Sequence, residues 1–78
     1  MQTVGVISAR EDWFRDWTRE IANTGGAKFV RIGRREDVRG YRFDLVIVIG
    51  DSGIRCSDGS DVYELFGLAQ QRRNRTSA

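Results

Sequence analysis

A serine follows directly after a strongly apolar stretch of this chain, in the segment Gly50-Asp51-Ser52. A turn at the end of a strand is a position where a serine can act as a nucleophile, provided that a base removes its proton. The 78-residue chain contains no histidine, and its one lysine, Lys28, begins a different predicted strand. We therefore expect no serine hydrolase chemistry. Gly50 is interpreted as the end of the strand and Gly53 as a residue of positive φ.

Two short motifs resemble parts of known enzymes. Gly50-Asp51-Ser52 after an apolar strand resembles the nucleophile block of the GDSL or SGNH hydrolases, a family that uses the histidine missing here. The stretch RGYRFDLVIVIGD, Arg39 to Asp51, resembles the approach to the Walker B strand of phage terminases and helicase-type ATPases, which implies that Asp51 faces magnesium. The G-x-x-x-x-G-K-S/T phosphate cradle is absent, and Ser52 replaces the usual second acidic residue. We expect a protein without enzyme activity or cofactor.

The composition is that of a soluble globular domain, with 40% hydrophobic and 31% charged residues. No apolar run approaches the roughly 20 residues that span a bilayer, and the N-terminus lacks the layout of a signal peptide. A cytoplasmic protein without a membrane partner is expected. The single Cys56, in a chain without histidine, predicts neither a disulfide nor a zinc site. Twelve arginines against one lysine suggest a GC-rich coding sequence, such as that of an actinobacterium or its phages.

Hydrophobic periodicity predicts alternating strands and helices. The predicted elements are a strand at 3–8, a helix at 9–23, a strand at 28–32, a helical turn at 35–38, a strand at 45–49 and a helix after Asp61. Ser8 and Glu11 have the spacing of a capping box, as do Asp61 and Glu64. Each helix has one apolar stripe, formed by Trp13, Phe14, Trp17 and Ile21 in the first and by Val62, Leu65, Phe66 and Ala69 in the second. The two tryptophans are interpreted as plates that cover the sheet.

The fold class expected is α/β, with two main helices on a small, mainly parallel three-stranded sheet in a β-α-β-β-α order. The strand order 2-1-3 would place helices on both faces, as in half of a Rossmann-like or flavodoxin-like domain. The five apolar residues of 45–49 indicate a strand covered on both faces, yet this order places them at an edge. We therefore expect that strand to pair with a second copy in a homodimer. Residues 1–70 form the predicted domain, and residues 71–78 a basic, frayed tail.

Two alternative ligand sites are predicted. Loops after the carboxyl ends of parallel strands suit an anion or nucleotide. The residues of this first candidate site are Ser8, Arg10, Arg34, Asp51, Ser52 and Gly53. Arginine clusters suit nucleic acid, although the chain without its three tail arginines has a net charge of −1. The residues of this second candidate site are Arg34, Arg35, Arg39, Arg42, Arg72, Arg73 and Arg75.

The sequence favours a noncatalytic interaction module, an accessory protein of a phage or an actinobacterium that dimerises and docks a partner protein. Exposed aromatic and arginine residues such as Tyr41, Tyr63 and Arg42 are of the types that anchor interfaces. The alternatives are a nucleic-acid-binding accessory protein and a nucleotide-binding or vestigial enzyme domain.

Overall fold

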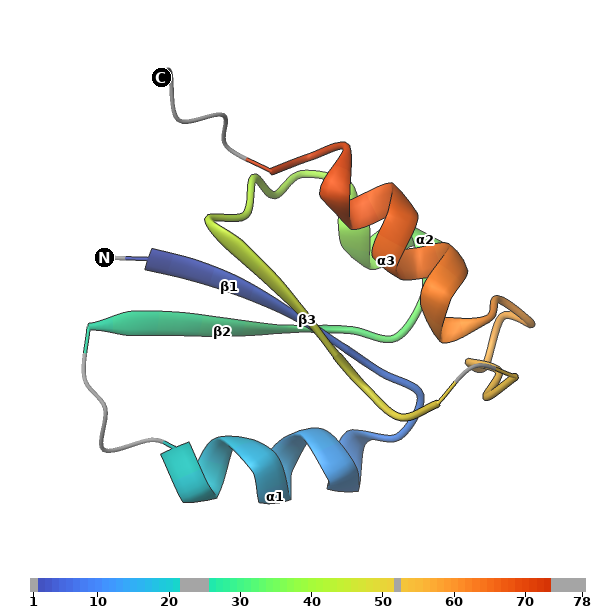
Figure 1. Cartoon of the computed structure of the whole chain (residues 1–78), viewed down its shortest axis with the longest axis horizontal. Coiled ribbons are helices and arrows are strands. Elements are labelled where there is room, and N and C mark those ends of the chain that lie inside the picture. Colours follow the sequence, from blue (N-terminus) through green and yellow to red (C-terminus); the bar gives the residue numbers. More distant parts are fainter. Residues whose placement is uncertain (1, 22–25, 52, 74–78) are drawn as a thin grey trace.

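A computed structural model describes residues 2–21, 26–51 and 53–73 of the chain. Its elements, in chain order, are β1 (Gln2–Ser8), α1 (Glu11–Ile21), β2 (Ala27–Ile32), α2 (Arg35–Val38), β3 (Leu45–Ile49) and α3 (Val62–Gln70). The three strands form one parallel sheet in the order β2-β1-β3 (Figure 1). The predicted small α/β fold, its strand order and the helical turn at 35–38 are all confirmed.

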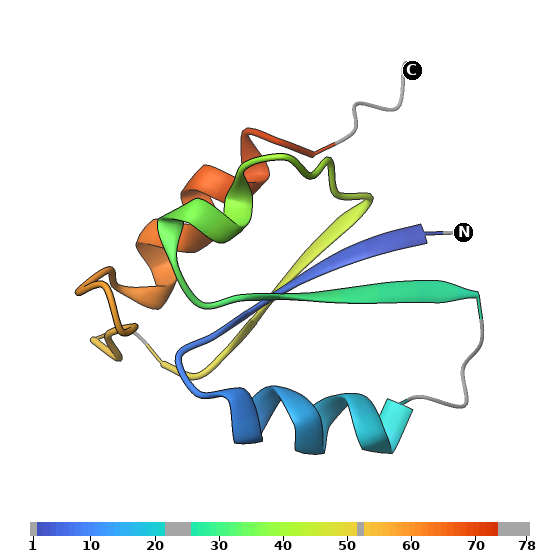
Figure 2. The ribbon, with the colours of Figure 1, turned by 180° about the vertical axis from the view of Figure 1, so that it is seen from behind.

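Helices cover both faces of the sheet, as predicted. In Figures 1 and 2, α1 lies on one face, while α2 and α3 lie together on the other. Successive side chains of a strand point to opposite faces. On the central strand, Val4 and Val6 are therefore buried on the α1 face, and Ile7 is buried in the main core on the face of α2 and α3.

The main core lies between the sheet and the pair α2 and α3. Its fully buried apolar residues are Ile7, Ile32, Phe43, Val62, Leu65 and Ala69. Gly5, on the central strand, leaves room for the ring of Phe43, since a Cβ at this position would lie 2.8 Å from Phe43 Cδ1. The absence of a side chain at Gly5 is therefore part of the packing of the core.

The start of α1 differs from the capping box predicted for Ser8 and Glu11. Ser8 remains at the end of β1, fully buried, and its hydroxyl donates a 2.6 Å hydrogen bond to the carbonyl of Arg10. The helix begins only at Glu11, with the Arg10 carbonyl accepting from the N–H of Phe14. The prediction was wrong because the chain needs two residues to leave the sheet before it can begin the helix.

The apolar stripe of α1 covers β1 and β2 without being fully buried. Trp13 and Trp17 are both half-buried, and the ring of Trp17 meets Phe29 of β2 edge-on at a centroid distance of 5.5 Å. The predicted helix extended to residue 23, but residues 22–25 lie outside the described part of the chain. No helix of the described segments has both the length and the apolar character required to cross a membrane.

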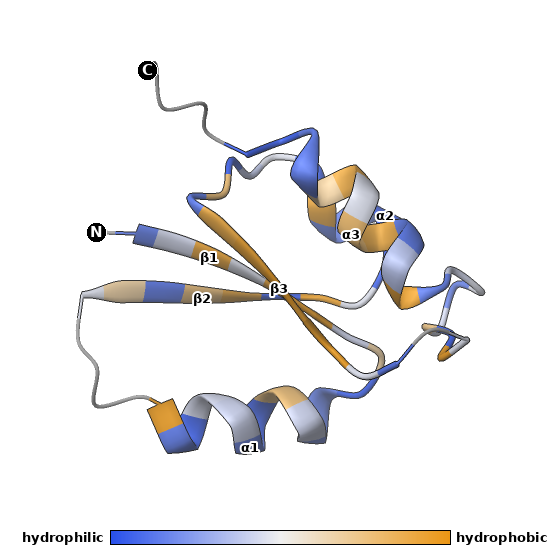
Figure 3. Cartoon of the chain, in the orientation of Figure 1, coloured by the Kyte–Doolittle hydropathy of each residue, from blue (hydrophilic) through white to orange (hydrophobic). Residues whose placement is uncertain are grey.

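Strand β3 is at the sheet edge, but its predicted cover on both faces is wrong. Val46 faces the main core and is buried, whereas Leu45, on the α1 face, is 43% exposed. Ile47 and Ile49 share the face of Leu45 and are half-buried. Figure 3 shows that β3 is hydrophobic throughout. The single helix on this face lies mainly over β1 and β2, so it covers β3 only in part.

Asp61 caps α3, as predicted, and also fixes the preceding loop. One carboxylate oxygen accepts a 2.8 Å hydrogen bond from the N–H of Tyr63, and the other accepts a 2.9 Å hydrogen bond from the N–H of Gly53. Gly53 has the positive φ predicted for it, at 95°. The carboxylate of Glu64 does not complete a capping box, because it forms an ion pair with Arg35 of α2.

Candidate functional site

The polar residues at the end of β1 bond within their own segment. The Ser8 hydroxyl is buried and donates to Arg10, as described above. The guanidinium of Arg10 forms an ion pair with Asp12 at 2.9 Å and lies over the ring of Trp13 at 5.5 Å from its centroid. The hydrogen bond between the two side chains raises the pKa of Arg10 and lowers that of Asp12. Asp12 therefore compensates the positive charge that Arg10 would offer to an anion.

The other residues predicted for the anion site are not brought into one pocket. Arg34 precedes α2 and lies 3.7 Å from the carboxylate of Asp37. Asp51 is exposed, its carbonyl accepts a hydrogen bond from Ile54, and Ser52 lies outside the described residues. The N–H of Gly53 is occupied by Asp61. Within the described residues, no group of three or more acidic, histidine or cysteine side chains could hold a metal ion.

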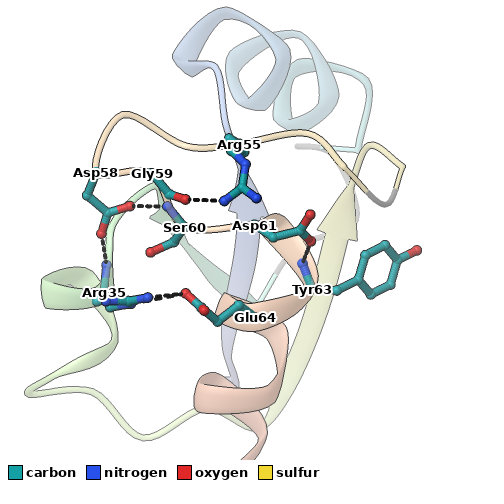
Figure 4. Close-up of polar contacts among 8 residues, drawn as sticks. All are labelled: Arg35, Arg55, Asp58, Gly59, Ser60, Asp61, Tyr63 and Glu64. Atoms are coloured by element: carbon teal, nitrogen blue, oxygen red, sulfur yellow. Dashed lines mark hydrogen bonds and ion pairs between the residues drawn. The ribbon is translucent and has the colours of Figure 1, made fainter.

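A cluster of charged groups joins the loop before α3 to both helices of that face (Figure 4). The carboxylate of Asp58 accepts hydrogen bonds from the backbone N–H groups of Arg35 and Ser60, both at 3.0 Å. The guanidinium of Arg35 forms an ion pair with Glu64 of α3. Arg55 donates a 2.7 Å hydrogen bond to the carbonyl of Gly59 within the loop. These contacts hold α2, the loop and α3 together.

The electrostatics of this cluster favour the charged forms of its acids. The two backbone donors lower the pKa of Asp58 to about 2. The hydrogen bond from Arg35 lowers the pKa of Glu64, and the same bond raises that of Arg35. Ser60, almost fully buried, adds a smaller lowering for both acids, although its hydroxyl oxygen has no hydrogen bond of good geometry within the described chain. The arrangement stabilises the fold and has no residue suited to act as a general base near pH 7.

Cys56 is buried next to this cluster. Burial raises the pKa of its thiol, and the negative charge of Asp58 raises it further. A thiol in these surroundings is a poor nucleophile, because the reactive form is the thiolate.

The predicted nucleic-acid residues divide into two groups. Three of them, Arg35, Arg39 and Arg72, line a single pocket although they come from distant parts of the sequence. The others are not part of its lining. Arg73 lies within 3.5 Å of Gln70 Oε1 and of the carbonyl of Asp44, and Arg75 lies outside the described residues. Arg42 is exposed, and Arg34 pairs with Asp37.

The pocket lies between α2 and the C-terminal half of α3, and we call it the arginine pocket. It has a volume of about 280 Å³. Its lining residues are Arg35, Val38, Arg39, Leu68, Gln71 and Arg72. The backbone of Arg72 is fixed by a 3.1 Å hydrogen bond that its carbonyl accepts from Phe43. The first residues after α3 are thereby held against the start of β3, on one side of the pocket.

Sequence reasoning identified the arginines but missed the pocket and its apolar residues, Val38 and Leu68. A local signal existed, because Arg35 and Arg39 are four positions apart around a helical turn, and Leu68 and Arg72 have the same spacing. Such spacing predicts a shared face for each pair. Only the packing of α2 on α3 brings the two faces together.

The aromatic residues proposed as interface anchors are exposed at separate places. Tyr41 is 39% exposed and stacks on Phe43, with Lys28 5.8 Å from its ring centroid. Tyr63, on α3, is 50% exposed and meets Phe66 edge-on. Neither tyrosine lines the arginine pocket.

Four features of the structure bear on function. They are the strand-end residues, the charged cluster, the arginine pocket and the partly exposed β3. Comparison of the chain with protein-family models, with curated proteins and with solved structures gives no match.

Proposed function

We propose that this protein is a noncatalytic interaction module that forms a homodimer through β3 and binds a partner protein in the cytoplasm. The observation that supports the proposal is the exposure of β3. The strand is hydrophobic along its length, yet Leu45 is 43% exposed and the outer edge from Leu45 to Ile49 pairs with no other strand of the described chain. An apolar edge of this kind is prone to add a strand from another molecule.

A second copy of β3 fits this edge in an antiparallel arrangement. A twofold axis at Ile47 would place Leu45 opposite Ile49 of the second copy, so apolar side chains would meet along the whole strand. The two sheets would then form one continuous sheet of six strands. Both α1 helices would lie on the same face, where they flank the exposed Leu45 and the half-buried Ile47 and Ile49.

The noncatalytic part of the proposal is supported by the chemistry of the strand ends. Ser52 has no histidine anywhere in the chain to act as its base. Ser8, Arg10 and Gly53 already use their polar groups within their own loops. A role as an accessory protein of a phage or an actinobacterium is an extension of this proposal, suggested by the preference for arginine over lysine.

Sedimentation equilibrium of the full chain at micromolar concentration tests the proposal. The expected result is a mass of two chains that falls to one on dilution. A mass of one chain throughout the micromolar range would contradict the dimer. Hydrogen exchange provides a second measurement, because the amides of β3 should exchange more slowly at concentrations where the dimer is populated.

A further inference from the structure

We infer that the arginine pocket is a docking site for a short acidic segment of a partner protein, in which an apolar side chain is flanked by Asp or Glu. The inference rests on the proposed function, because it identifies where such a module would bind its partner. The pocket lies on the face of α2 and α3, opposite the face on which Leu45 is exposed.

The charge of the pocket is positive and largely uncompensated. None of its six lining residues is acidic. Arg35 is neutralised by Glu64, but the side chains of Arg39 and Arg72 form no ion pair or hydrogen bond with any described residue. Both are exposed, and they approach the pocket from α2 and from the end of α3. Two arginines in the lining of one cavity suit two carboxylates, since arginine can bind a carboxylate through two parallel hydrogen bonds.

The pocket also has an apolar surface that a simple anion would leave unused. Val38 is buried beneath it, and Leu68 is half-buried at its wall. The volume of about 280 Å³ is slightly below the ~300–1,000 Å³ of typical small-molecule pockets. An aliphatic or aromatic side chain of a peptide fits this space better than a large ligand. The arginine stems can extend the apolar contact while their charged ends face the flanking acids.

Nucleic acid matches the pocket less well than an acidic peptide does. Only two of the lining arginines carry uncompensated charge, and the carboxylates of Asp58 and Glu64 lie beside the third. Phosphate binding gains its strength from many neutralised phosphates. No aromatic side chain lines the pocket to stack on a base. A peptide in which Asp or Glu flanks an apolar residue would contact both the positive charge and the apolar surface of the pocket.

Selection from a random 12-residue peptide display library on the full-length protein tests the inference. Peptides are recovered on the natural protein and then compared on the double variant Arg39→Gln/Arg72→Gln. Neither residue has a described side-chain partner, so the double variant should fold normally, which circular dichroism can verify. The control is Arg15→Gln/Arg19→Gln, which removes two exposed positive charges from α1 on the other face of the sheet.

The expected peptides carry an apolar residue flanked by acids, bind at least tenfold more weakly to the Arg39/Arg72 variant and bind normally to the control. In nuclear magnetic resonance spectra they should shift the amides of Val38 and Gln71. Three results would overturn the inference: no enriched peptide, enriched peptides without acids, or binding that the Arg39/Arg72 variant leaves unchanged. A 20-nucleotide single strand that competes with the peptides and binds more tightly than they do would also overturn it, in favour of nucleic acid.

The same samples separate failure of this site from failure of the proposed function. A dimer that enriches no acidic peptide would leave the module proposal standing without this site. A monomer that binds acidic peptides at the pocket would keep the site and remove the dimer.

Discussion

The carboxylate of Asp58 accepts a 3.0 Å hydrogen bond from the backbone N–H of Arg35, although 23 positions separate the two residues. The same carboxylate accepts from the N–H of Ser60, so one side chain joins the start of α2 to the loop before α3. The N–H of Arg35 is one of the first in its helix and has no partner within the helix. Asp58 therefore satisfies a donor that α2 itself leaves open.

This contact predicts that stability falls in acid. Asp58 has a pKa of about 2 in the folded protein, against an ordinary value of 3.8. Above about pH 5 the carboxyl group is charged in both the folded and the unfolded state, and the stabilisation is complete. Between pH 4 and pH 2 the unfolded state takes up the proton first, so the free energy of unfolding decreases. The lowered pKa of Glu64 acts in the same direction.

Urea unfolding of Asp58→Asn over this pH range measures the contribution. Between pH 4 and pH 2 the variant should lose less stability than the natural protein, because it lacks one carboxyl group whose pKa is lowered by folding. Asp51→Asn is the matched control, since Asp51 accepts no side-chain hydrogen bond from a described residue. Equal slopes for Asp58→Asn and the natural protein would contradict the assignment.

The cap of α3 predicts a loss of stability on removal of the Asp61 side chain. Asp61→Ala would leave the N–H groups of Tyr63 and Gly53 without their partner. The expected cost is about 1 kcal/mol in the free energy of unfolding, from chemical denaturation. Asp61→Asn keeps an oxygen acceptor and should restore most of this stability. If the alanine and asparagine variants are equally stable, the hydrogen bonds of the Asp61 cap do not contribute to the stability of the fold.

The packing of Phe43 against β1 predicts opposite effects of alanine at two glycines. Gly5→Ala would place a Cβ 2.8 Å from the Phe43 ring and 3.0 Å from Ile32 Cδ1. Overpacking of this kind costs about 1–3 kcal/mol. Gly67→Ala, within α3, meets no atom within 4 Å and should add roughly 0.5–1 kcal/mol, since alanine favours helix. Thermal or urea unfolding measures the change in stability of each variant. A Gly5→Ala variant as stable as the natural protein would contradict the close packing.

The proposed dimer predicts that a charge at Leu45 separates the two chains. Leu45→Lys would bring a lysine into the apolar contact of both copies, while the side chain, already 43% exposed, can reach solvent in the single chain. Sedimentation should show a single chain at concentrations where the natural protein is a dimer. Tyr63→Lys, at a residue that is 50% exposed on α3, should leave the dimer intact. A Leu45→Lys protein that remains dimeric would show that β3 is not the interface.

The sequence by itself determined the elements and their order. The apolar run at Leu45–Ile49, the stripes of the two helices and the cap at Asp61 are local patterns, because each depends on the period of side chains along one element. Alternation of strands and helices then limits the topology, since parallel strands require crossovers of one hand. The start of α1 could not be predicted in this way, because Ser8 is held by burial in the sheet.

Only the tertiary structure decided which residues share a surface. Arg35 and Arg39 meet Leu68 and Arg72 because α2 packs on α3, and no spacing along the chain encodes that distance. The exposure of Leu45 likewise depends on where α1 lies across the sheet, since this helix lies mainly over β1 and β2 and leaves Leu45 at the start of β3 exposed. Periodicity predicts the apolar face of an element. The element that covers that face is set by the packing of the whole chain.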